Sequence, residues 1–250
     1  MISIKGKWAF VTGASRGIGK QISLNLARLG CNLIIHSRKK QHNNELINIL
    51  NENNIESVAV EAEFLNKNEL EKMLDEIKRL NIKIDILYNN AAIMTPFRQD
   101  PWKIPAEDFR KCFEVNVIAM AQICYAFVPD MIKRKWGRII NVTSGIQKQP
   151  ELTTYAISKA AVDKFVRDFG PILNNTGVAM NLLDPGWLKT DLGGPNAPNP
   201  VDDVIPGALV PALIPEPLNG HLFCALDYQG MTIPEAVKKT TVEIFQKNQV

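Results

Sequence analysis

The chain has 250 residues, of which 46% are hydrophobic and 22% charged, a composition that excludes wholesale disorder and allows a sizeable core. The 29 basic and 26 acidic residues leave a net charge of only +3, so neither nucleic acid nor an anionic membrane is expected as a partner. The 4 cysteines form no CxxC pair, so we expect no metal site. The sequence has no apolar run of about 18 residues, so we expect no membrane span. Because it has no signal-peptide pattern and its cysteines suggest a reducing compartment, we expect a cytoplasmic location.

Short apolar runs alternate with longer amphipathic segments along the chain. The apolar runs predict strands at residues 8–11, 32–36, 57–60, 84–88, 137–142, 178–183 and 222–225. Helical spacing of apolar residues predicts helices at 18–29, 44–53, 70–77, 106–135 and 155–169, the fourth interrupted or ended near Pro129. This alternation predicts an α/β fold, a doubly wound parallel sheet with helices on both faces, in a single domain over residues 1–250.

Residues 186–217 interrupt this alternation because their prolines and glycines prevent a regular helix. The segment follows a predicted strand, so it is either an ordinary surface loop or a mobile cover over a substrate pocket, and we favour the cover. The tail at 232–250 predicts an additional amphipathic helix for packing or an interface.

A glycine-rich turn, residues 12–19, joins the first predicted strand to the first helix. Gly13 permits a tight turn, while Gly17 and Gly19 let the backbone approach a pyrophosphate and let the helix pack on the sheet. The helix N-terminus adds N–H donors and a partial positive charge. Many such turns have no ligand, but the position of this one favours a dinucleotide site.

The end of the second predicted strand indicates which dinucleotide is bound. An NAD site would place an acidic residue there, and residues 35–40 contain none. Arg38 and Arg16 could pair with a 2′-phosphate, and Ser37 could donate a hydrogen bond to it. The alternative is a solvated basic loop. The pattern favours NADP(H), with NAD(H) as the second choice.

Tyr155 and Lys159 lie one helical turn apart in a Y-x-x-x-K pattern. Such a pair is usually structural. Beside a nucleotide site it predicts acid/base chemistry, because a tyrosine can exchange a proton with a carbonyl or alcohol oxygen if its pKa of about 10 is lowered. The lysine ammonium and an oxidised nicotinamide ring both favour the phenolate.

The sequence resembles the short-chain dehydrogenase/reductase family over nearly its whole length. Six motifs in family order carry the resemblance: TGASRGIG at 12–19, NNAA at 89–92, Asn116, IINVTS ending at Ser144, YAISK at 155–159, and Pro185-Gly186 followed by Thr190. The resemblance implies a Rossmann fold and an NADP(H)-preferring oxidoreductase that moves hydride between nicotinamide C4 and a small-molecule carbonyl or secondary alcohol. The alternatives are an NAD-dependent alcohol dehydrogenase and a non-catalytic dinucleotide sensor on the same fold.

The resemblance also implies roles for individual residues. Tyr155 would be the general acid/base, Ser144 would polarise the substrate oxygen, and Lys159 would lower the tyrosine pKa and bind the nicotinamide ribose. Asn116 would hold a water that extends a proton relay through Lys159. The cofactor contacts are expected at Gly13, Ser15, Arg16, Gly17, Ile18, Gly19, Ser37, Arg38, Glu63, Phe64, Asn90, Ala91, Tyr155, Lys159, Pro185, Gly186, Leu188 and Thr190. Glu63 and Phe64 would lie against the adenine, and Leu188 and Thr190 beside the carboxamide.

The sequence departs from the family pattern at three points. Ala92 replaces a glycine, and Glu63 replaces an aspartate. Ser144 precedes Tyr155 by eleven residues, which is shorter than the common interval, so Thr143 is the fallback for Ser144.

The substrate pocket and the oligomeric state are the last expectations. The pocket should lie between residues 94–102 and the loop after Gly186, with an apolar lining from Met94, Phe97, Trp187, Leu188 and Leu192. The family suggests a homodimer or homotetramer that associates through helices at 117–134 and 155–169.

Overall fold

The computed structural model describes residues 1–247. Within these residues the chain forms one seven-stranded parallel sheet, in the order β3-β2-β1-β4-β5-β6-β7. The strands are β1 (Trp8–Val11), β2 (Asn32–Ser37), β3 (Ser57–Glu61), β4 (Ile84–Asn89), β5 (Gly137–Val142), β6 (Val178–Asp184) and β7 (Leu222–Cys224). The predicted doubly wound α/β architecture is confirmed.

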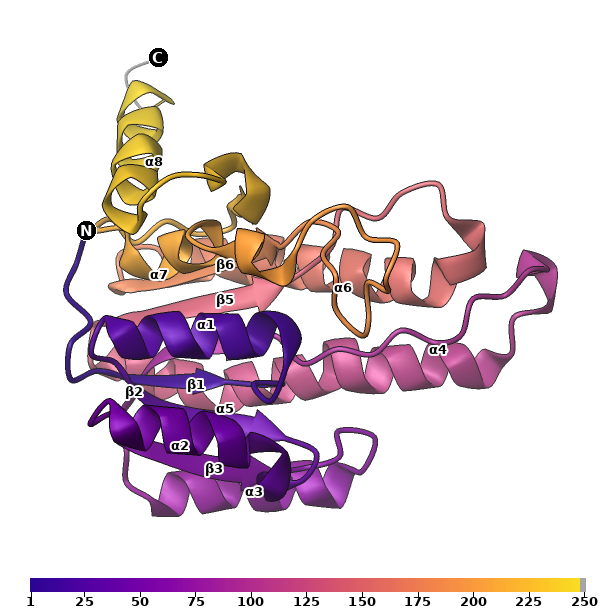
Figure 1. Cartoon of the computed structure of the whole chain (residues 1–250), viewed down its shortest axis with the longest axis horizontal. Helices are drawn as coiled ribbons and strands as arrows, with labels where there is room; N and C mark the ends of the chain where they lie inside the picture. The colour runs from indigo at the N-terminus through magenta and orange to yellow at the C-terminus, as the bar shows by residue number, and fades with distance from the viewer. Residues whose placement is uncertain (248–250) are drawn as a thin grey trace.

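Helices cover both faces of the sheet (Figure 1). One face carries α1 (Gly17–Arg28), α2 (Asn44–Glu52), α7 (Val210–Leu213) and α8 (Ile233–Lys247). The other carries α3 (Lys67–Arg79), α5 (Met120–Lys133) and α6 (Thr153–Phe169), and α4 (Ala106–Phe113) leads into α5. Neighbouring strand residues alternate between the two cores: Phe10 and Leu87 face one, Val11 and Tyr88 the other. Because both faces are covered, the strands are continuous apolar runs, as the sequence indicated.

The predicted helix at 106–135 is interrupted at a different place. A π-helical turn, η3 (Glu114–Ala119), lies between α4 and α5, whereas α5 runs through Pro129 to Lys133. The prediction of a break near Pro129 was therefore wrong: the buried neighbours Val128 and Met131 hold that turn in the core although the proline supplies no N–H. Residues 106–133 contain an 18-residue stretch with a mean hydropathy of 1.5, which is long and apolar enough to cross a membrane by length and composition alone, but many side chains of this segment pack in the core against the sheet.

The predicted loop at 186–217 is shorter than expected. Thr190 and Asp191 contact the glycine turn, but Val204, Leu209 and Leu213 are 0% exposed and belong to the core. The prolines fit there because the segment consists of short turns, including η7 (Gly207–Leu209) and α7. The tail forms α8, which packs through Ala236 and Val237 on the same core, and residues 248–250 lie outside the described part.

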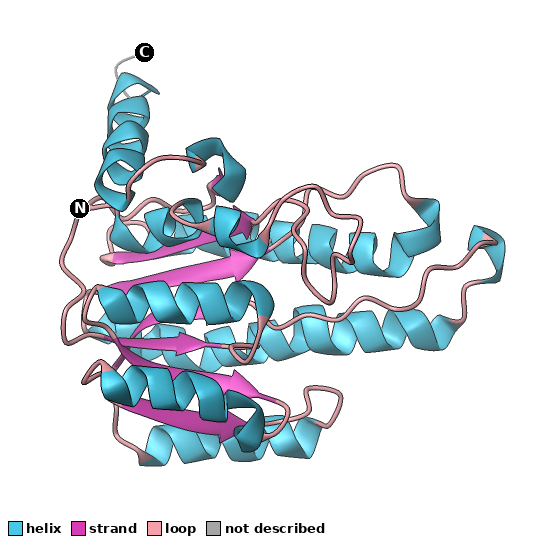
Figure 2. Cartoon of the chain, in the orientation of Figure 1, coloured by secondary structure: helices cyan, strands magenta, loops and turns pink. Residues whose placement is uncertain are grey.

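All seven strands end at one edge of the sheet (Figure 2). The loops that leave this edge contain the predicted functional residues, and the order of the strands reverses between β1 and β4 there. Ligands of open α/β sheets bind in the crevice outside the carboxyl ends of the strands at such a reversal.

Candidate active site

The glycine loop between β1 and α1 is packed directly against the end of β4. A Cβ atom on Gly19 would lie 2.2 Å from the Gly13 carbonyl oxygen and 2.6 Å from Asn90 Nδ2, so only glycine fits. Asn90 Nδ2 donates to the carbonyl oxygens of Thr12 at 2.9 Å and of Gly13 at 3.1 Å. The Thr12 hydroxyl accepts the N–H groups of Asn90 and Ala91, both at 3.0 Å. The Asn90 side chain therefore braces the loop.

The N-terminus of α1 has the features of a phosphate site. Arg16, the residue that precedes the helix, makes no side-chain hydrogen bond to its first turn. Gly17 has a φ of +54°, and the first-turn residues Ile18 and Gly19 follow it. Uncapped N–H groups at the start of a helix bind anions. The half-buried Ser15 lies in the turn itself, so this loop suits a pyrophosphate.

Two arginines lie near the expected position of a 2′-phosphate. Arg38 is exposed, and its side chain makes no hydrogen bond or ion pair with residues 1–243. Arg16 forms an ion pair with Asp191 at 2.7 Å, with both side chains largely exposed. Ser37 differs from expectation, because its hydroxyl donates to the Lys39 carbonyl oxygen at 2.6 Å and is 3% exposed. Its single proton is already used, so it is not a donor to a phosphate here.

The expected adenine residues are engaged within the protein. The Glu63 N–H donates to Glu69 Oε2 at 2.8 Å, and the Glu63 carboxylate accepts the Leu65 N–H. The Phe64 ring is 4% exposed and stacks on His36 with a centroid distance of 4.3 Å. The ring of Phe64 therefore belongs to the core, which leaves the backbone of this segment for contact with an adenine.

Tyr155, Ser144 and Lys159 come together from α6 and the end of β5. The Ser144 hydroxyl hydrogen-bonds to the Tyr155 phenol. Lys159 Nζ lies 5.7 Å from the centre of the Tyr155 ring and donates to the Val142 carbonyl oxygen at 2.8 Å. Tyr155 is 7% exposed and Lys159 3%. The i, i+4 spacing on one helix thus brings the pair to the same place, as predicted.

The structure distinguishes Ser144 from its fallback. Thr143 is 2% exposed, and its hydroxyl donates to Asp163 Oδ1 at 2.5 Å. Both residues thus face α6, but Thr143 binds Asp163 whereas Ser144 hydrogen-bonds to the Tyr155 phenol. Thr143 is therefore excluded as the residue beside Tyr155, in spite of the short interval to Tyr155.

Burial controls the proton affinities of the pair. It raises the pKa of Tyr155 to about 12, against the effect of the Ser144 hydrogen bond and with a smaller contribution from Asp184 in the same direction. It lowers the pKa of Lys159 to about 8, which the Asp163 carboxylate opposes. The expected lowering of the tyrosine pKa does not hold in the protein alone, because the phenol is desolvated and the ammonium is bonded to Val142.

Asn116 lies in the π-helical turn and is completely engaged. Its Oδ1 accepts the Ile93 N–H at 2.8 Å, and its Nδ2 donates to the Ile93 carbonyl oxygen and to Ser158 Oγ, both at 2.9 Å. Ser158 in turn donates to the Tyr155 carbonyl oxygen at 2.7 Å. The Asn116 side chain therefore ties the loop after β4 to the helix that carries Tyr155, and its backbone alone is left for the predicted water.

The segment after β6 lies over the glycine loop. A Cβ on Gly17 would lie 3.3 Å from Thr190 Cγ2, and the Arg16–Asp191 ion pair joins the same two segments. Pro185 is buried, and Gly186 has a φ of +78° and donates its N–H to Asp184 Oδ1 at 3.0 Å. Leu188 is 2% exposed and packs in the core, so it is not part of an apolar pocket lining.

The remaining pocket candidates are accessible. Phe97, Trp187 and Leu192 are 61%, 58% and 37% exposed, and Met94 is half-buried. The Trp187 indole N–H donates to the Gly193 carbonyl oxygen at 2.8 Å, which fixes that ring. Large exposed apolar side chains of this kind are able to contact a ligand with hydrophobic surface.

Sequence reasoning missed several residues that shape the site. Thr12 was part of a recognised motif, whereas His36, Asp163 and Asp184 belonged to none. Their importance depends on contacts between elements far apart in the sequence: Asp163 binds Thr143, and His36 binds Gly13. Only a buried position at a strand end indicated His36 in advance.

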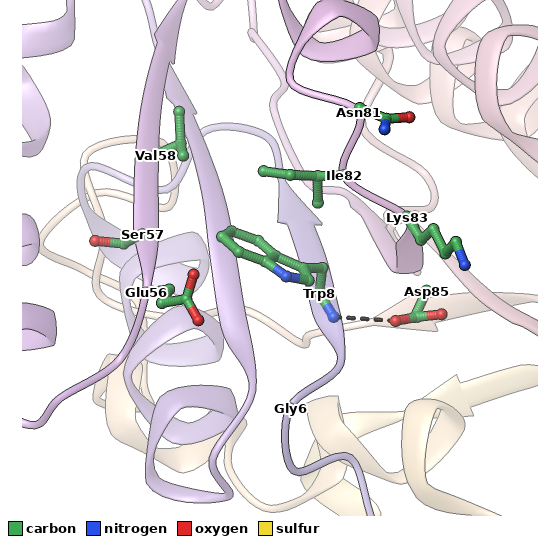
Figure 3. A pocket seen from close by; sticks show the side chains of 9 residues that line it. All are labelled: Gly6, Trp8, Glu56, Ser57, Val58, Asn81, Ile82, Lys83 and Asp85. Atoms are coloured by element: carbon green, nitrogen blue, oxygen red, sulfur yellow. Dashed lines mark hydrogen bonds between the residues drawn. The ribbon is translucent and has the colours of Figure 1, made fainter.

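A surface pocket of about 740 Å³ lies at the opposite edge of the sheet (Figure 3). It is lined by the starts of β1, β3 and β4, including Trp8, Val58 and Ile82. The Trp8 N–H donates to Asp85 Oδ2 at 3.1 Å (Figure 3). This pocket contains none of the predicted site residues and is separate from the carboxyl edge.

Comparison with known proteins gives concordant matches. Residues 7–200 match the family described as short chain dehydrogenase. The chain is 31% identical to a 7alpha-hydroxysteroid dehydrogenase of Escherichia coli, over 76% of this chain and 74% of the relative. It is also 31% identical to a 3-oxoacyl-[acyl-carrier-protein] reductase of Synechocystis, over 77% of this chain and 78% of the relative.

Solved structures share the fold at lower identity. A gluconate 5-dehydrogenase from Burkholderia cenocepacia, in complex with NADP and tartrate, has a TM-score of 0.78 and 23% identity, and the match covers 88% of this chain and 93% of that one. A 3-oxoacyl (acyl-carrier-protein) reductase from Agrobacterium tumefaciens with NADP bound has a TM-score of 0.78 and 22% identity, and the match covers 92% of this chain and 95% of that one.

Proposed function

Because the chain belongs to the short-chain dehydrogenase family, whose members are nicotinamide-dependent oxidoreductases, we propose that it is an NADP(H)-preferring enzyme that interconverts a carbonyl and a secondary alcohol. The observation that carries this proposal is the meeting of Tyr155, Ser144 and Lys159 at the carboxyl edge of the sheet. The substrate would be a small molecule with apolar surface, since Phe97 and Trp187 are large exposed apolar side chains on the loops after β4 and β6.

The glycine loop and the two arginines support NADP(H) as the cofactor. Gly19 fits only without a side chain, Gly13 has a φ of +65° that favours glycine, and the uncapped start of α1 suits the pyrophosphate. Arg38 is unpaired within residues 1–243, and the ion pair of Arg16 is exposed, so both guanidinium groups can turn to a 2′-phosphate. Lys159 would bind the nicotinamide ribose. The NADP-bound relatives of the same fold agree with this assignment.

When bound, the cofactor supplies or accepts the hydride at its nicotinamide ring. The protein handles the proton. In the reducing direction the Tyr155 phenol gives its proton to the substrate oxygen, while Ser144 hydrogen-bonds to the same oxygen and orients it. The raised pKa keeps this phenol protonated at neutral pH, which suits a proton donor. Lys159 holds positive charge nearby and stabilises the phenolate that remains.

Replacement of Tyr155 by Phe tests the chemical role. Removal of the general acid should lower kcat for NADPH-dependent carbonyl reduction by at least about 100-fold. NADPH affinity, measured by fluorescence titration, should remain nearly unchanged. A variant that retains more than a tenth of the wild-type rate would show that Tyr155 is not the acid/base. Loss of NADPH absorbance against a panel of ketones, aldehydes and quinones provides the assay.

We also propose that the protein forms a homodimer or homotetramer through α5 and α6. Tyr125 and Ile157 are 58% and 45% exposed. The centroid of the Tyr125 ring lies 6.2 Å from that of Phe165 and 5.9 Å from that of Phe169. Exposed aromatic clusters of this kind are typical of interfaces. Light scattering should therefore give a multiple of 27.9 kDa, and Tyr125→Glu should shift it toward the single-chain value. A wild-type mass of one chain at micromolar concentration would refute the proposal.

A further inference from the structure

His36 occupies a junction between three segments at the carboxyl edge of the sheet. It lies at the end of β2, beside the glycine loop and the end of β3, and its side chain is 3% exposed. The Gly13 N–H donates to His36 Nδ1 at 3.2 Å, and His36 Nε2 lies 3.0 Å from the Ala62 carbonyl oxygen. Both ring nitrogens are therefore used by backbone groups.

These partners define one protonation state of the ring. A backbone N–H can only donate, so Nδ1 must accept, and a carbonyl oxygen can only accept, so Nε2 must carry the proton. Burial lowers the pKa of His36 to about 4, so the ring is neutral at pH 7. The neutral Nε2–H form is the only one that satisfies both contacts.

The bond to Gly13 fixes a peptide that would otherwise rotate. The carbonyl oxygen of the Thr12–Gly13 peptide accepts from Asn90 Nδ2 at 2.9 Å, and the N–H of the same peptide is held by His36. Gly13 has a φ of +65°, and glycine tolerates many backbone conformations, so the peptide needs both anchors. The next N–H, that of Ala14, donates to the His36 carbonyl oxygen at 2.9 Å.

The same ring holds the segment on the other side. It stacks on Phe64 with parallel planes, 1° apart, and Phe64 follows the Ala62 peptide that Nε2 contacts. His36 therefore connects the glycine loop with residues 62–64, the two segments expected beside the pyrophosphate and the adenine.

We propose that His36 is a positioning residue for NADP(H): its Nδ1 sets the orientation of the Thr12–Gly13 peptide in the glycine loop. This inference rests on the proposed function. His36 itself need not touch the cofactor, and its effect should appear in cofactor affinity and not in the chemical step.

Two substitutions separate the ring's contacts. In His36→Asn the amide oxygen can take the place of Nδ1 and accept from Gly13, whereas in His36→Gln the longer amide reaches the place of Nε2 and the Gly13 N–H loses its acceptor. Because an unpaired buried N–H is costly, His36→Gln should raise Kd for NADPH at least about tenfold, and His36→Asn should stay within about threefold of wild type. The exposed His42 provides a matched control, and His42→Gln should bind like wild type.

The experiment titrates NADPH and NADH into all four proteins and measures KM and kcat. The expected loss in His36→Gln lies in KM for the cofactor. Equal losses in the Asn and Gln variants, or a loss confined to kcat, would overturn the inference while leaving the proposed function intact. Failure of the wild type to bind either cofactor would instead overturn the proposed function and this inference with it.

A measurement on the unmodified protein covers the case in which the variants do not fold. Nitrogen-15 NMR of the wild type at pH 7 should show His36 neutral, with a protonated Nε2, and its Nδ1 signal should shift when NADPH is added. A charged ring or an Nδ1–H tautomer would refute the proposal.

Discussion

The ion pair between Arg16 and Asp191 competes with the proposed contact to the 2′-phosphate. Its N···O distance is 2.7 Å, but the two side chains are 63% and 71% exposed. Exposed pairs of this kind contribute about 0.2–1 kcal/mol, whereas a hydrogen bond to a charged group contributes about 1.5–3 kcal/mol. Arg16 should therefore leave Asp191 for the phosphate, and the competing pair should weaken NADPH binding by about 1.4- to 5-fold.

Asp191→Asn should lower Kd for NADPH by this factor. The Asp191 charge also repels the phosphates that NADPH and NADH share, and this repulsion affects Kd for both cofactors. The effect specific to Arg16 is therefore the factor by which Asp191→Asn changes Kd for NADPH, divided by the factor by which it changes Kd for NADH. Arg16→Ala should raise Kd for NADPH at least about tenfold. In the double variant that combines Arg16→Ala with Asp191→Asn, the effect specific to Arg16 should be absent. Fluorescence titration of the wild type, the two single variants and the double variant measures these Kd values. The titrations are done at low and high salt, since salt screens exposed charges.

The competition would be refuted by an Asp191→Asn gain of the same size in the presence and absence of Arg16. It would also be refuted by equal gains for NADPH and NADH. If Arg38→Ala removed the cofactor preference and Arg16→Ala did not, Arg38 alone would bind the 2′-phosphate.

Three further outcomes are expected. Burial lowers the pKa of Lys159 from 10.5 to about 8, so its charge opposes folding below pH 8 and this cost disappears between pH 8 and 10.5. The free energy of unfolding of Lys159→Met in urea, taken relative to wild type, should therefore be roughly 2 kcal/mol higher at pH 7 than at pH 9.5, and equal differences at the two pH values would contradict the lowered pKa. Gly19→Ala should weaken NADPH binding more than about tenfold in the same titration, because its Cβ would meet the Gly13 carbonyl oxygen at 2.2 Å, and unchanged affinity would contradict the packing. Asn116→Ala should lower the unfolding free energy by about 1–3 kcal/mol for each of the two Ile93 backbone groups left unpaired, as a denaturant titration would show. A total loss below about 2 kcal/mol would contradict these contacts.

Much of the fold could be predicted because its rules are local. A strand covered on both faces must be apolar throughout, as β5 is, and the glycines of residues 12–19 are required by close packing around Gly19. The positions of Tyr155 and Lys159 followed from helical spacing alone. These features depend on neighbours in the sequence or on the periodicity of one element.

The rest depended on contacts that no local pattern reveals. Ser37 was expected to bind the cofactor and Asn116 a water. Instead, the Ser37 hydroxyl and the Asn116 amide both form hydrogen bonds within the protein. Residues 204–214 looked like a loop because of their prolines, yet their apolar side chains fill the core in short turns. The break in the long helix came from a π-helical turn, η3, for which the sequence carried no signal comparable to Pro129.

The anchoring of Ser144 and Tyr155 by separate elements has a consequence for the redesign of this enzyme. Ser144 follows β5, where its neighbour Thr143 is pinned to the body of the protein by Asp163 and by a backbone bond to Leu183, and Tyr155 is carried by α6. The connection at residues 145–152 therefore need not have any particular length for the two hydroxyls to meet. It should accept grafted sequences of other lengths while Ser144 and Tyr155 stay in place.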